Sequence, residues 1–255
     1  MTNFEIISQT LLDNNLQLKA EEIKKLEKFY DLLINYNTKV NLTSITDIYE
    51  VSLKHFVDSL FHMKHYQENS TVLDIGTGAG FPGIPLAIVR SDLEITLVDS
   101  LNKRVDFLDL VIQELDLHNV KAYHSRAQEF CTKENREKYD YCIARAVAPM
   151  NILLELCLPF VKLNGEFVGY KSLNLENELK EAEFAIKTLG GNLITTTKYL
   201  LNTQLINTVY PQKLEYKEPI TRNIVEIQKI KHTATIYPRL KNLIKLNPII
   251  NKNLK

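Results

Sequence analysis

Alternating glycines follow an acidic residue at the end of an apolar run. The stretch reads VLDIGTGAGFPGIP over residues 72–85, with Asp74 ahead of Gly76, Gly78 and Gly80. Glycine lacks a Cβ and accepts positive φ, so a loop of this kind lets a ligand approach the backbone closely. The N–H groups at the start of the helix that follows can face an anionic group. The stretch therefore predicts a cofactor-binding loop, and the alternative is a tight strand-to-helix turn without a ligand.

A second acid stands where such a site needs one. Asp99 closes the apolar stretch EITLVD, 23 residues after Gly76. An acid at the end of the second strand can accept hydrogen bonds from ribose hydroxyls. The pair of features indicates a nucleoside-containing cofactor.

The glycine spacing distinguishes two cofactor classes. Dinucleotide loops read G-x-G-x-x-G directly after the strand, but Phe81 occupies the third glycine position. The frame Gly78, Gly80 and Gly83 begins too far past the strand and contains Pro82. The observed acid-x-G-x-G-x-G string suits S-adenosylmethionine, whose carboxylate can face loop N–H groups while an acid lies near its ammonium group.

The segments around the loop alternate between strand and helix patterns. Strands are predicted over 71–75, 94–99, 120–125, 139–145 and 166–171, with helices near 84–90, 102–115, 151–161 and 175–190. Three further segments, near 192–200, 204–210 and 222–229, have no helical pattern between them and are predicted to be antiparallel strands. The alternation predicts an α/β, Rossmann-like fold with a doubly wound, mostly parallel sheet.

Residues 1–66 are predicted to form an N-terminal helical cap. Apolar residues recur at helical spacing from Ile23 to Tyr36, and Asp47 with Glu50 has the spacing of a capping box. The helix that starts there would place four residues on one face: Val51, His55, Asp58 and His62.

Composition and charge set the broad class. The chain has 255 residues, of which 45% are apolar and 24% charged, and no run of 18 apolar residues occurs. The N-terminus lacks the basic region of a signal peptide, and the three cysteines show no C-x-x-C spacing. We expect a globular cytoplasmic protein with free thiols and no membrane contact.

The net charge of zero conceals an asymmetry. Seven Lys or Arg residues and no acid lie between Lys229 and Lys255, so residues 1–228 carry 24 basic and 31 acidic side chains. Such a tail indicates contact with a polyanion, or else a solvated, solubilising segment. The predicted organisation is a cap over 1–66, a catalytic domain over 67–230 and a basic tail over 231–255.

Several motifs beyond the glycine loop resemble one family. The chain is similar to the RsmG (GidB) methyltransferases in seven stretches: NLTS (41–44), HFVDS (55–59), DIGTGAGFPGIP (74–85), LVDS-x-x-KRV-x-FL (97–108), SRA (125–127), ARAVA (144–148) and YPR (237–239). Lys171, which closes the fifth predicted strand, also matches. The resemblance extends from about residue 20 to 250, and the combination of motifs is specific.

The resemblance implies a class I S-adenosylmethionine-dependent methyltransferase that modifies N7 of a guanine in 16S ribosomal RNA. It implies that Gly76 and Phe81 line the cofactor site, with Ala127 and Gln128 near the adenine and Arg145 at the edge of the pocket. The family usually has Glu where this chain has Gln128. Together with the loop, the expected cofactor-binding residues are Asp74, Gly76, Gly78, Gly80, Phe81, Asp99, Ala127, Gln128 and Arg145.

The sequence lacks the motifs that other methyl acceptors require, and methylation of guanine N7 requires none of them. Cys142 and Cys157 do not stand in the setting of a cytosine-C5 nucleophile, and the turn after the fourth strand lacks the N/D-P-P-aromatic pattern of amino-methylating enzymes. Guanine N7 has an exposed lone pair and needs no deprotonation, so no general base is expected and positioning dominates. A different methyl acceptor and a non-enzymatic, cofactor-sensing RNA-binding module stay open as alternatives.

Four residues are candidates on the substrate side: His55, Asp58, Arg145 and Lys171. His55 and Asp58 could equally form a buried pair that fixes the cap on the main domain. Metal binding by His55, His62 and His65 is not expected, because no cluster of carboxylates or cysteines in the sequence completes a site with them. The expected partner is small-subunit ribosomal RNA or the pre-assembled small subunit.

Overall fold

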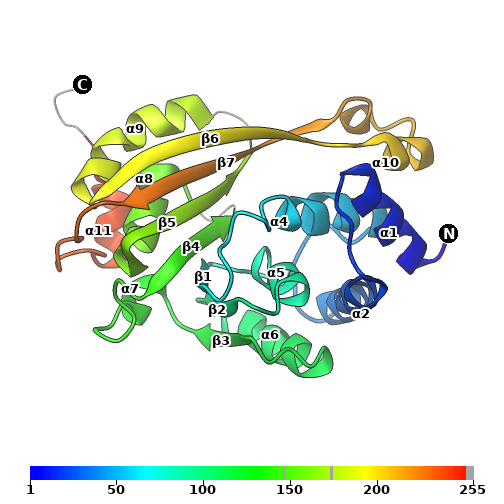
Figure 1. Cartoon of the computed structure of the whole chain (residues 1–255), viewed down its shortest axis with the longest axis horizontal. Coiled ribbons are helices and arrows are strands. Elements are labelled where there is room, and N and C mark those ends of the chain that lie inside the picture. The colour runs from blue at the N-terminus through cyan, green and yellow to red at the C-terminus, as the bar shows by residue number, and fades with distance from the viewer. Residues whose placement is uncertain (146–147, 173–174, 251–255) are drawn as a thin grey trace.

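One seven-stranded sheet runs through the part of the chain that the computed structural model describes, residues 1–145, 148–172 and 175–250 (Figure 1). Its strand order is β3 (Val120–His124), β2 (Glu94–Asp99), β1 (Thr71–Ile75), β4 (Tyr139–Arg145), β5 (Val161–Lys171), β7 (Ile220–Lys229) and β6 (Gly191–Leu201). Strands β1 to β5 are parallel, and β7 is antiparallel to both its neighbours. The predicted doubly wound, mostly parallel sheet is confirmed.

Helices cover both faces of the sheet. One face packs against α5 (Gly83–Val89), α6 (Asn102–Glu114) and the N-terminal helices, whereas the other packs against α7 (Ala127–Phe130), α8 (Met150–Cys157), α9 (Leu175–Thr188) and α11 (Lys241–Leu246). Each face buries its own apolar cluster. Removal of apolar surface from water, at about 25 cal/mol per Å², is the main force that holds these layers together.

The N-terminal helices belong to the first of these clusters. They are α1 (Asn3–Asp13), α2 (Ala20–Asn37), α3 (Ile48–Val51), a π-helical turn over Ser52–Val57 and α4 (Asp58–Leu60). Four apolar residues of α2 are buried, namely Ile23, Leu26, Phe29 and Leu33. The centre of the Phe29 ring lies 5.2 Å from that of Phe81 and 6.3 Å from that of Phe107. The cap therefore has no separate core, and the boundary at residue 66 stays a prediction.

The order in which strands join the sheet reverses between β1 and β4. From β1 the strands proceed outward to β2 and β3, and β4 then returns to the other side of β1. In open α/β sheets the carboxyl ends of the strands beside this point form the ligand-binding crevice. The glycine loop after β1 and Asp99 at the end of β2 both lie there.

The structure corrects three local predictions. Residues 204–210, predicted to be a strand, form helix α10 (Gln204–Val209), because Ile206 and Tyr210 lie one helical turn apart and face inward. The helix predicted over 151–161 ends at Cys157, and a 3₁₀ turn over Leu158–Phe160 leads into β5. Asp47 does cap α3, but the Glu50 carboxylate accepts from Lys213 and Tyr216 instead of closing a capping box.

The C-terminal tail is packed against the body rather than freely solvated. Ile244 and Ile249 are buried, and the buried carboxylate of Glu155 accepts hydrogen bonds from the backbone and side chain of Arg239. The Lys229 ammonium is also buried and donates to the Leu158 carbonyl. Two of the seven tail cations are therefore held by the protein itself.

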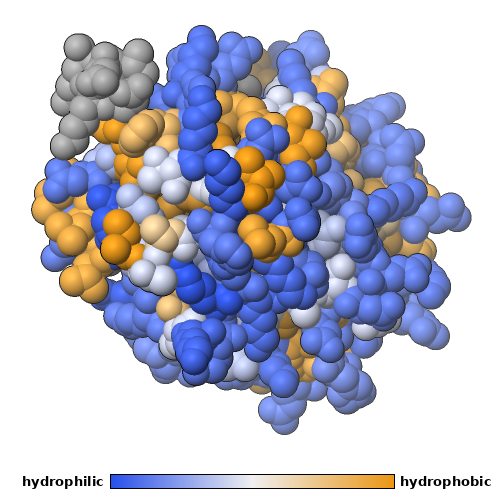
Figure 2. Space-filling view, turned by 60° about the vertical axis from the view of Figure 1, so that its left-hand side comes forward, coloured by the Kyte–Doolittle hydropathy of each residue, from blue (hydrophilic) through white to orange (hydrophobic). Residues whose placement is uncertain are grey.

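Other tail side chains remain at the surface. Figure 2 shows hydrophobic patches among the hydrophilic surface of one face of the molecule. Four exposed apolar side chains of the tail are Ile236, Leu240, Leu243 and Leu246. All three cysteines are unpaired, as expected. None of the helices in the described ranges is long and apolar enough to cross a membrane.

Candidate active site

The glycine loop leaves β1 through left-handed backbone. Gly78 has φ of 63° and Gly80 has φ of 93°, values that side-chain-bearing residues rarely adopt. A Cβ on Gly80 would lie 2.6 Å from Ile84, whereas one on Gly78 would meet nothing within 4 Å. Gly80 is thus required for packing against α5, while Gly78 faces open space.

Asp74 holds this loop from behind. Its Oδ2 accepts hydrogen bonds from the Thr77 hydroxyl at 2.7 Å and from the Gly83 amide at 2.9 Å. The side chain is completely buried, and burial raises the pKa of Asp74 to about 7 against the opposing effect of these hydrogen bonds. Oδ1 is buried without a hydrogen-bond partner among the described residues, so it remains available to a ligand donor.

Asp99 connects the ends of β1 and β2. Its Oδ2 accepts from the Gly78 amide at 2.9 Å and lies 3.3 Å from the Arg104 guanidinium, and its Oδ1 accepts from the Leu101 amide at 2.9 Å. A carboxylate has about four acceptor positions, so hydroxyl donors can still bind. The two acids therefore have different positions, with Asp74 under the loop and Asp99 at its open side.

A cavity of about 360 Å³ opens beside Asp99. This volume is in the range of small-molecule sites. Apolar walls, polar backbone and one acid meet here, which suits a nucleoside such as that of S-adenosylmethionine. The lining comes from five segments: Ile75–Gly76, Val98–Ser100 with Arg104, Ser125–Gln128, Ala148 with Ile152 and Leu156, and Ile244–Lys245.

The cavity contains only part of the expected cofactor set. Gly76, Asp99, Ala127 and Gln128 line it. The other expected contacts lie outside this lining, namely Asp74, Gly78, Gly80, Phe81 and Arg145. Their contact with the cofactor stays a prediction.

The tail supplies a wall that the sequence did not predict. Ile244 and Lys245 of α11 line the same cavity as Asp99, although more than a hundred residues separate them from Asp99 in the sequence. The basic character of the tail had indicated a remote role in binding a polyanion. The signal that could have revealed the wall is the set of apolar residues interspersed among those charges.

Arg145 joins two other substrate-side candidates, His55 and Asp58, in one hydrogen-bond network. At the end of β4, its Nη1 donates to Asp58 Oδ2 at 2.8 Å, and its Nη2 lies 3.1 Å from His55 Nδ1. Asp58 Oδ1 accepts from the Tyr199 hydroxyl at 2.7 Å. His55 stacks on the Phe81 ring at 4.4 Å between centroids. The cap, the glycine loop and two strands thus meet at one guanidinium.

The network fixes the protonation state of His55. Burial and the neighbouring Arg145 charge lower the pKa of His55 to about 3, so the ring is neutral at pH 7. Its Nδ1 lies between the Arg145 guanidinium, at 3.1 Å, and the Lys54 carbonyl, at 3.2 Å, and its Nε2 lies 3.3 Å from the Thr43 hydroxyl. Both ring nitrogens of His55 therefore already have partners within the protein.

Lys171 stabilises the cavity wall from outside. Its ammonium donates to the Ala148 carbonyl at 3.0 Å and pairs with Glu178 at 2.6 Å, and only 11% of the side chain is exposed. Ala148 lines the cavity. Lys171 is therefore placed to position Ala148 in the cavity wall.

Solved structures of low sequence identity share this fold. One is the [4+2]-cyclase SpnF, with a TM-score of 0.53 and 12% identity over 79% of this chain and 94% of that chain. Another, from Galdieria sulphuraria, has been proposed to be a sarcosine dimethylglycine methyltransferase; its TM-score is 0.52, with 13% identity over 82% of this chain and 99% of that one. The strand order and the cavity define the class as that of the Rossmann-like, S-adenosylmethionine-dependent methyltransferase fold.

Sequence comparison narrows the class to one family. The family described as rRNA small subunit methyltransferase G (GidB) matches residues 22–206, and the chain belongs to it. A relative named ribosomal RNA small subunit methyltransferase G from Desulforamulus reducens is 44% identical over 95% of this chain and 97% of its own length. One of the same name from Clostridium botulinum is 41% identical over 98% of this chain and its full length. The resemblance noted in the sequence is confirmed.

Proposed function

We propose that the protein transfers a methyl group from S-adenosylmethionine to N7 of a guanine in 16S ribosomal RNA. The observation that carries the proposal is the cavity beside Asp99 at the reversal point of the sheet, in a chain 44% identical to a ribosomal RNA methyltransferase G. The substrate would be small-subunit RNA, free or in an assembling subunit, and the site of action the cytoplasm.

The cavity residues have distinct roles in this proposal. Asp99 accepts hydrogen bonds from the ribose hydroxyls, and Ala127 with Gln128 contacts the adenine ring. Gln128 can both donate and accept, so it can pair with an exocyclic amino group as the family's Glu would. Asp74 maintains the shape of the loop and offers Oδ1 to the ammonium group of the cofactor.

The chemical step needs orientation more than acid–base catalysis. S-adenosylmethionine supplies an electrophilic methyl group when bound, and guanine N7 already has a lone pair. The polar side chains at the edge of the site already bind one another: Arg145 is paired with Asp58, and its guanidinium contacts the His55 ring. They hold the edge of the site rigid and so favour in-line approach of the two reactants.

The rim of the cavity carries exposed positive charge that suits RNA phosphates. Arg126 and Lys245 line the cavity with exposed side chains, and Lys103 is exposed on α6 next to Arg104. Phosphate contacts by Lys and Arg position nucleic acid without reading its sequence. We infer that the backbone around the target guanine crosses this rim.

A labelling experiment tests the proposal against the other acceptors. The purified protein is incubated with tritiated S-adenosylmethionine and, in parallel, with small-subunit rRNA or assembled subunits from a strain that lacks the enzyme, with large-subunit rRNA, and with protein extract freed of RNA. We expect label in small-subunit RNA alone. Label in protein would indicate another acceptor, and cofactor binding without label in any RNA would indicate a sensing module.

A further inference from the structure

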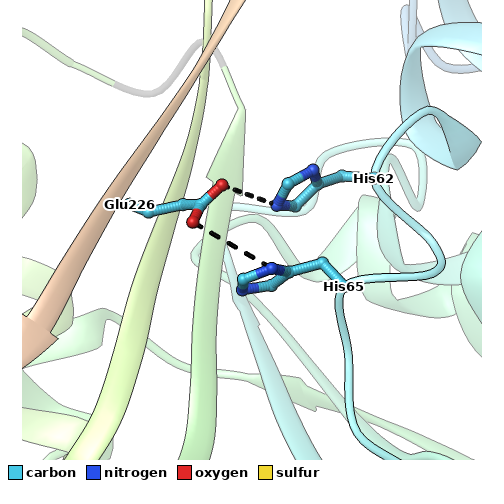
Figure 3. A group of neighbouring side chains, drawn as sticks. All are labelled: His62, His65 and Glu226. Atoms are coloured by element: carbon cyan, nitrogen blue, oxygen red, sulfur yellow. Dashed lines mark ion pairs between the residues drawn. The ribbon is translucent and has the colours of Figure 1, made fainter. Parts of the chain in front are cut away.

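A second polar cluster lies on the sheet face that the cap covers, away from the cofactor cavity. His62 and His65, from the turn after α4, meet Glu226 of β7 (Figure 3). His62 Nε2 lies 3.0 Å from one carboxylate oxygen of Glu226, and His65 Nδ1 lies 4.0 Å from the other. The three donor atoms lie within 4.8 Å of one another.

Glu166 of β5 orients this cluster. Its Oε2 lies 2.6 Å from His65 Nε2, so that nitrogen is occupied and Nδ1 is the one turned toward Glu226. A carboxylate on the far nitrogen of a histidine is the usual support of a metal-binding imidazole, because it fixes the ring and raises its basicity. His62 Nε2 is buried and, despite its closeness to Glu226, has no contact with hydrogen-bond geometry.

The donor set and its spacing match those of a zinc site. Two imidazoles and one carboxylate with a fourth, open position are a known zinc coordination. Zinc bonds of about 2.0–2.2 Å place tetrahedral donors roughly 3.3 Å apart. His62 lies 3.0 Å from one oxygen of Glu226 and His65 lies 4.0 Å from the other, and the whole donor set lies within 4.8 Å, so small side-chain rotations bring the three donors to one ion. We propose that His62, His65 and Glu226 bind a Zn²⁺ ion, with Glu166 positioning His65.

The sequence did not predict a metal site, because a sequence pattern includes only residues close to the histidines in the chain. The sequence shows no cluster of carboxylates or cysteines that completes a site, but the fold brings Glu166 and Glu226 to the histidines from more than 100 residues away. The atom that His62 offers to an ion is Nε2, which is buried and lies 3.0 Å from Glu226 Oε1.

The position of the cluster indicates what the ion would do. His62 and His65 lie in the connection from the cap to β1, whereas the two glutamates lie on β5 and β7. An ion shared by these elements would fasten the cap to the sheet. The cluster shares no residue with the cavity lining, so zinc binding and cofactor binding are separable measurements.

The test uses the full chain after EDTA treatment and dialysis. Calorimetric titration with ZnCl₂ should show one equivalent bound, with no response to MgCl₂, which prefers oxygen ligands. At a zinc concentration about 100 times Kd, the melting temperature should rise by roughly 5–10 °C. His62→Gln and Glu226→Gln should abolish both effects, and Glu166→Gln should weaken binding roughly 10–100-fold.

His118→Gln is the matched control, because its side chain is 86% exposed and remote in sequence from the cluster. This variant should bind zinc as the wild type does. S-adenosylmethionine affinity, measured on every variant, reports that each has folded. Failure of the wild type to bind zinc, or undiminished binding by folded His62→Gln, would overturn the proposal. A melting temperature that responds to pH but not to zinc would instead identify a proton-linked ion-pair cluster.

Discussion

Asp99 is the residue on which cofactor recognition depends most directly in this account. Asp99→Ala removes a charged acceptor from the cavity and also frees the amides of Gly78 and Leu101. Loss of a hydrogen bond to a charged group costs about 1.5–3 kcal/mol, so S-adenosylmethionine should bind roughly 10–150-fold more weakly. Titration calorimetry measures this, and NAD should show no binding.

Asp106→Ala is the control for Asp99. Asp106 lies exposed on α6 and accepts hydrogen bonds from Asn102. Its removal should leave cofactor affinity at the wild-type value. Equal affinity of wild type and Asp99→Ala would remove Asp99 from the ribose site.

Asp74 should make stability depend on pH in an identifiable way. Its pKa in the folded protein is about 7, above the ordinary value of 3.8. Between these values the folded state binds the proton that the unfolded state releases, so the contribution of Asp74 to stability falls as pH rises from about 4 to 7. The wild type should therefore lose stability relative to Asp74→Asn over this range, as thermal unfolding at pH 5, 6, 7 and 8 would reveal. A constant difference between the two proteins would contradict the raised pKa.

At the scale of elements, helix α11 makes the C-terminal tail part of the wall of the cavity. Ile244→Ala trims a buried side chain that lines the cavity, and each lost CH₂ costs about 0.8 kcal/mol. This substitution removes three carbon groups, so with two or three of them in contact with the cofactor, S-adenosylmethionine affinity should fall by roughly 15–60-fold. Leu246→Ala, two positions on and 76% exposed, should change nothing. Unaltered affinity in Ile244→Ala would mean that α11 is only an outer cover of the site.

This element also shows where sequence reasoning stops. The charges of the tail indicated contact with a polyanion or a solvated segment, and neither reading gave the tail a place beside the cofactor. The structure instead places Ile244 and Lys245 in the cavity wall and pairs Arg239 with Glu155. Strands β1, β2 and β4 were predicted to the residue, because each is a short apolar run between clear turn signals.

The parts that local patterns could not predict depend on contacts between distant segments. Residues 204–210 were predicted to be a strand instead of helix α10 because a run of only seven residues is too short to distinguish the helical from the strand period. Glu166 and Glu226 look like ordinary solvent-facing strand residues in the sequence, and only the packing of the cap over the sheet turns them toward His62 and His65.

At the scale of the whole molecule, the net charge is zero, so affinity for RNA has to come from the local distribution of positive charge. A variant with Lys103, Arg126 and Lys245 changed to Ala loses three exposed cations at the cavity rim. Each phosphate contact contributes about 0.7–0.9 to the log–log salt dependence of binding, so the slope should shrink by roughly 2–3. Filter binding at several salt concentrations measures it.

The matching control changes three exposed lysines elsewhere to Ala: Lys24 on α2, Lys180 on α9 and Lys217 after α10. The two variants have the same net charge, so a nonspecific effect would shift both slopes equally. The proposed RNA path requires that only the rim variant shifts. Equal slopes in the two variants would place the RNA on another face.

The most direct test of the account is the identity of the methylated nucleoside. Small-subunit RNA from a strain lacking the enzyme is treated with the protein and S-adenosylmethionine, digested to nucleosides and analysed by mass spectrometry, with Asp99→Ala in parallel. The account predicts one 7-methylguanosine per RNA molecule with the wild type and far less with Asp99→Ala at the same cofactor concentration. Methylation of any other nucleoside or of another guanine atom, or equal product from the two proteins at limiting cofactor, would contradict it.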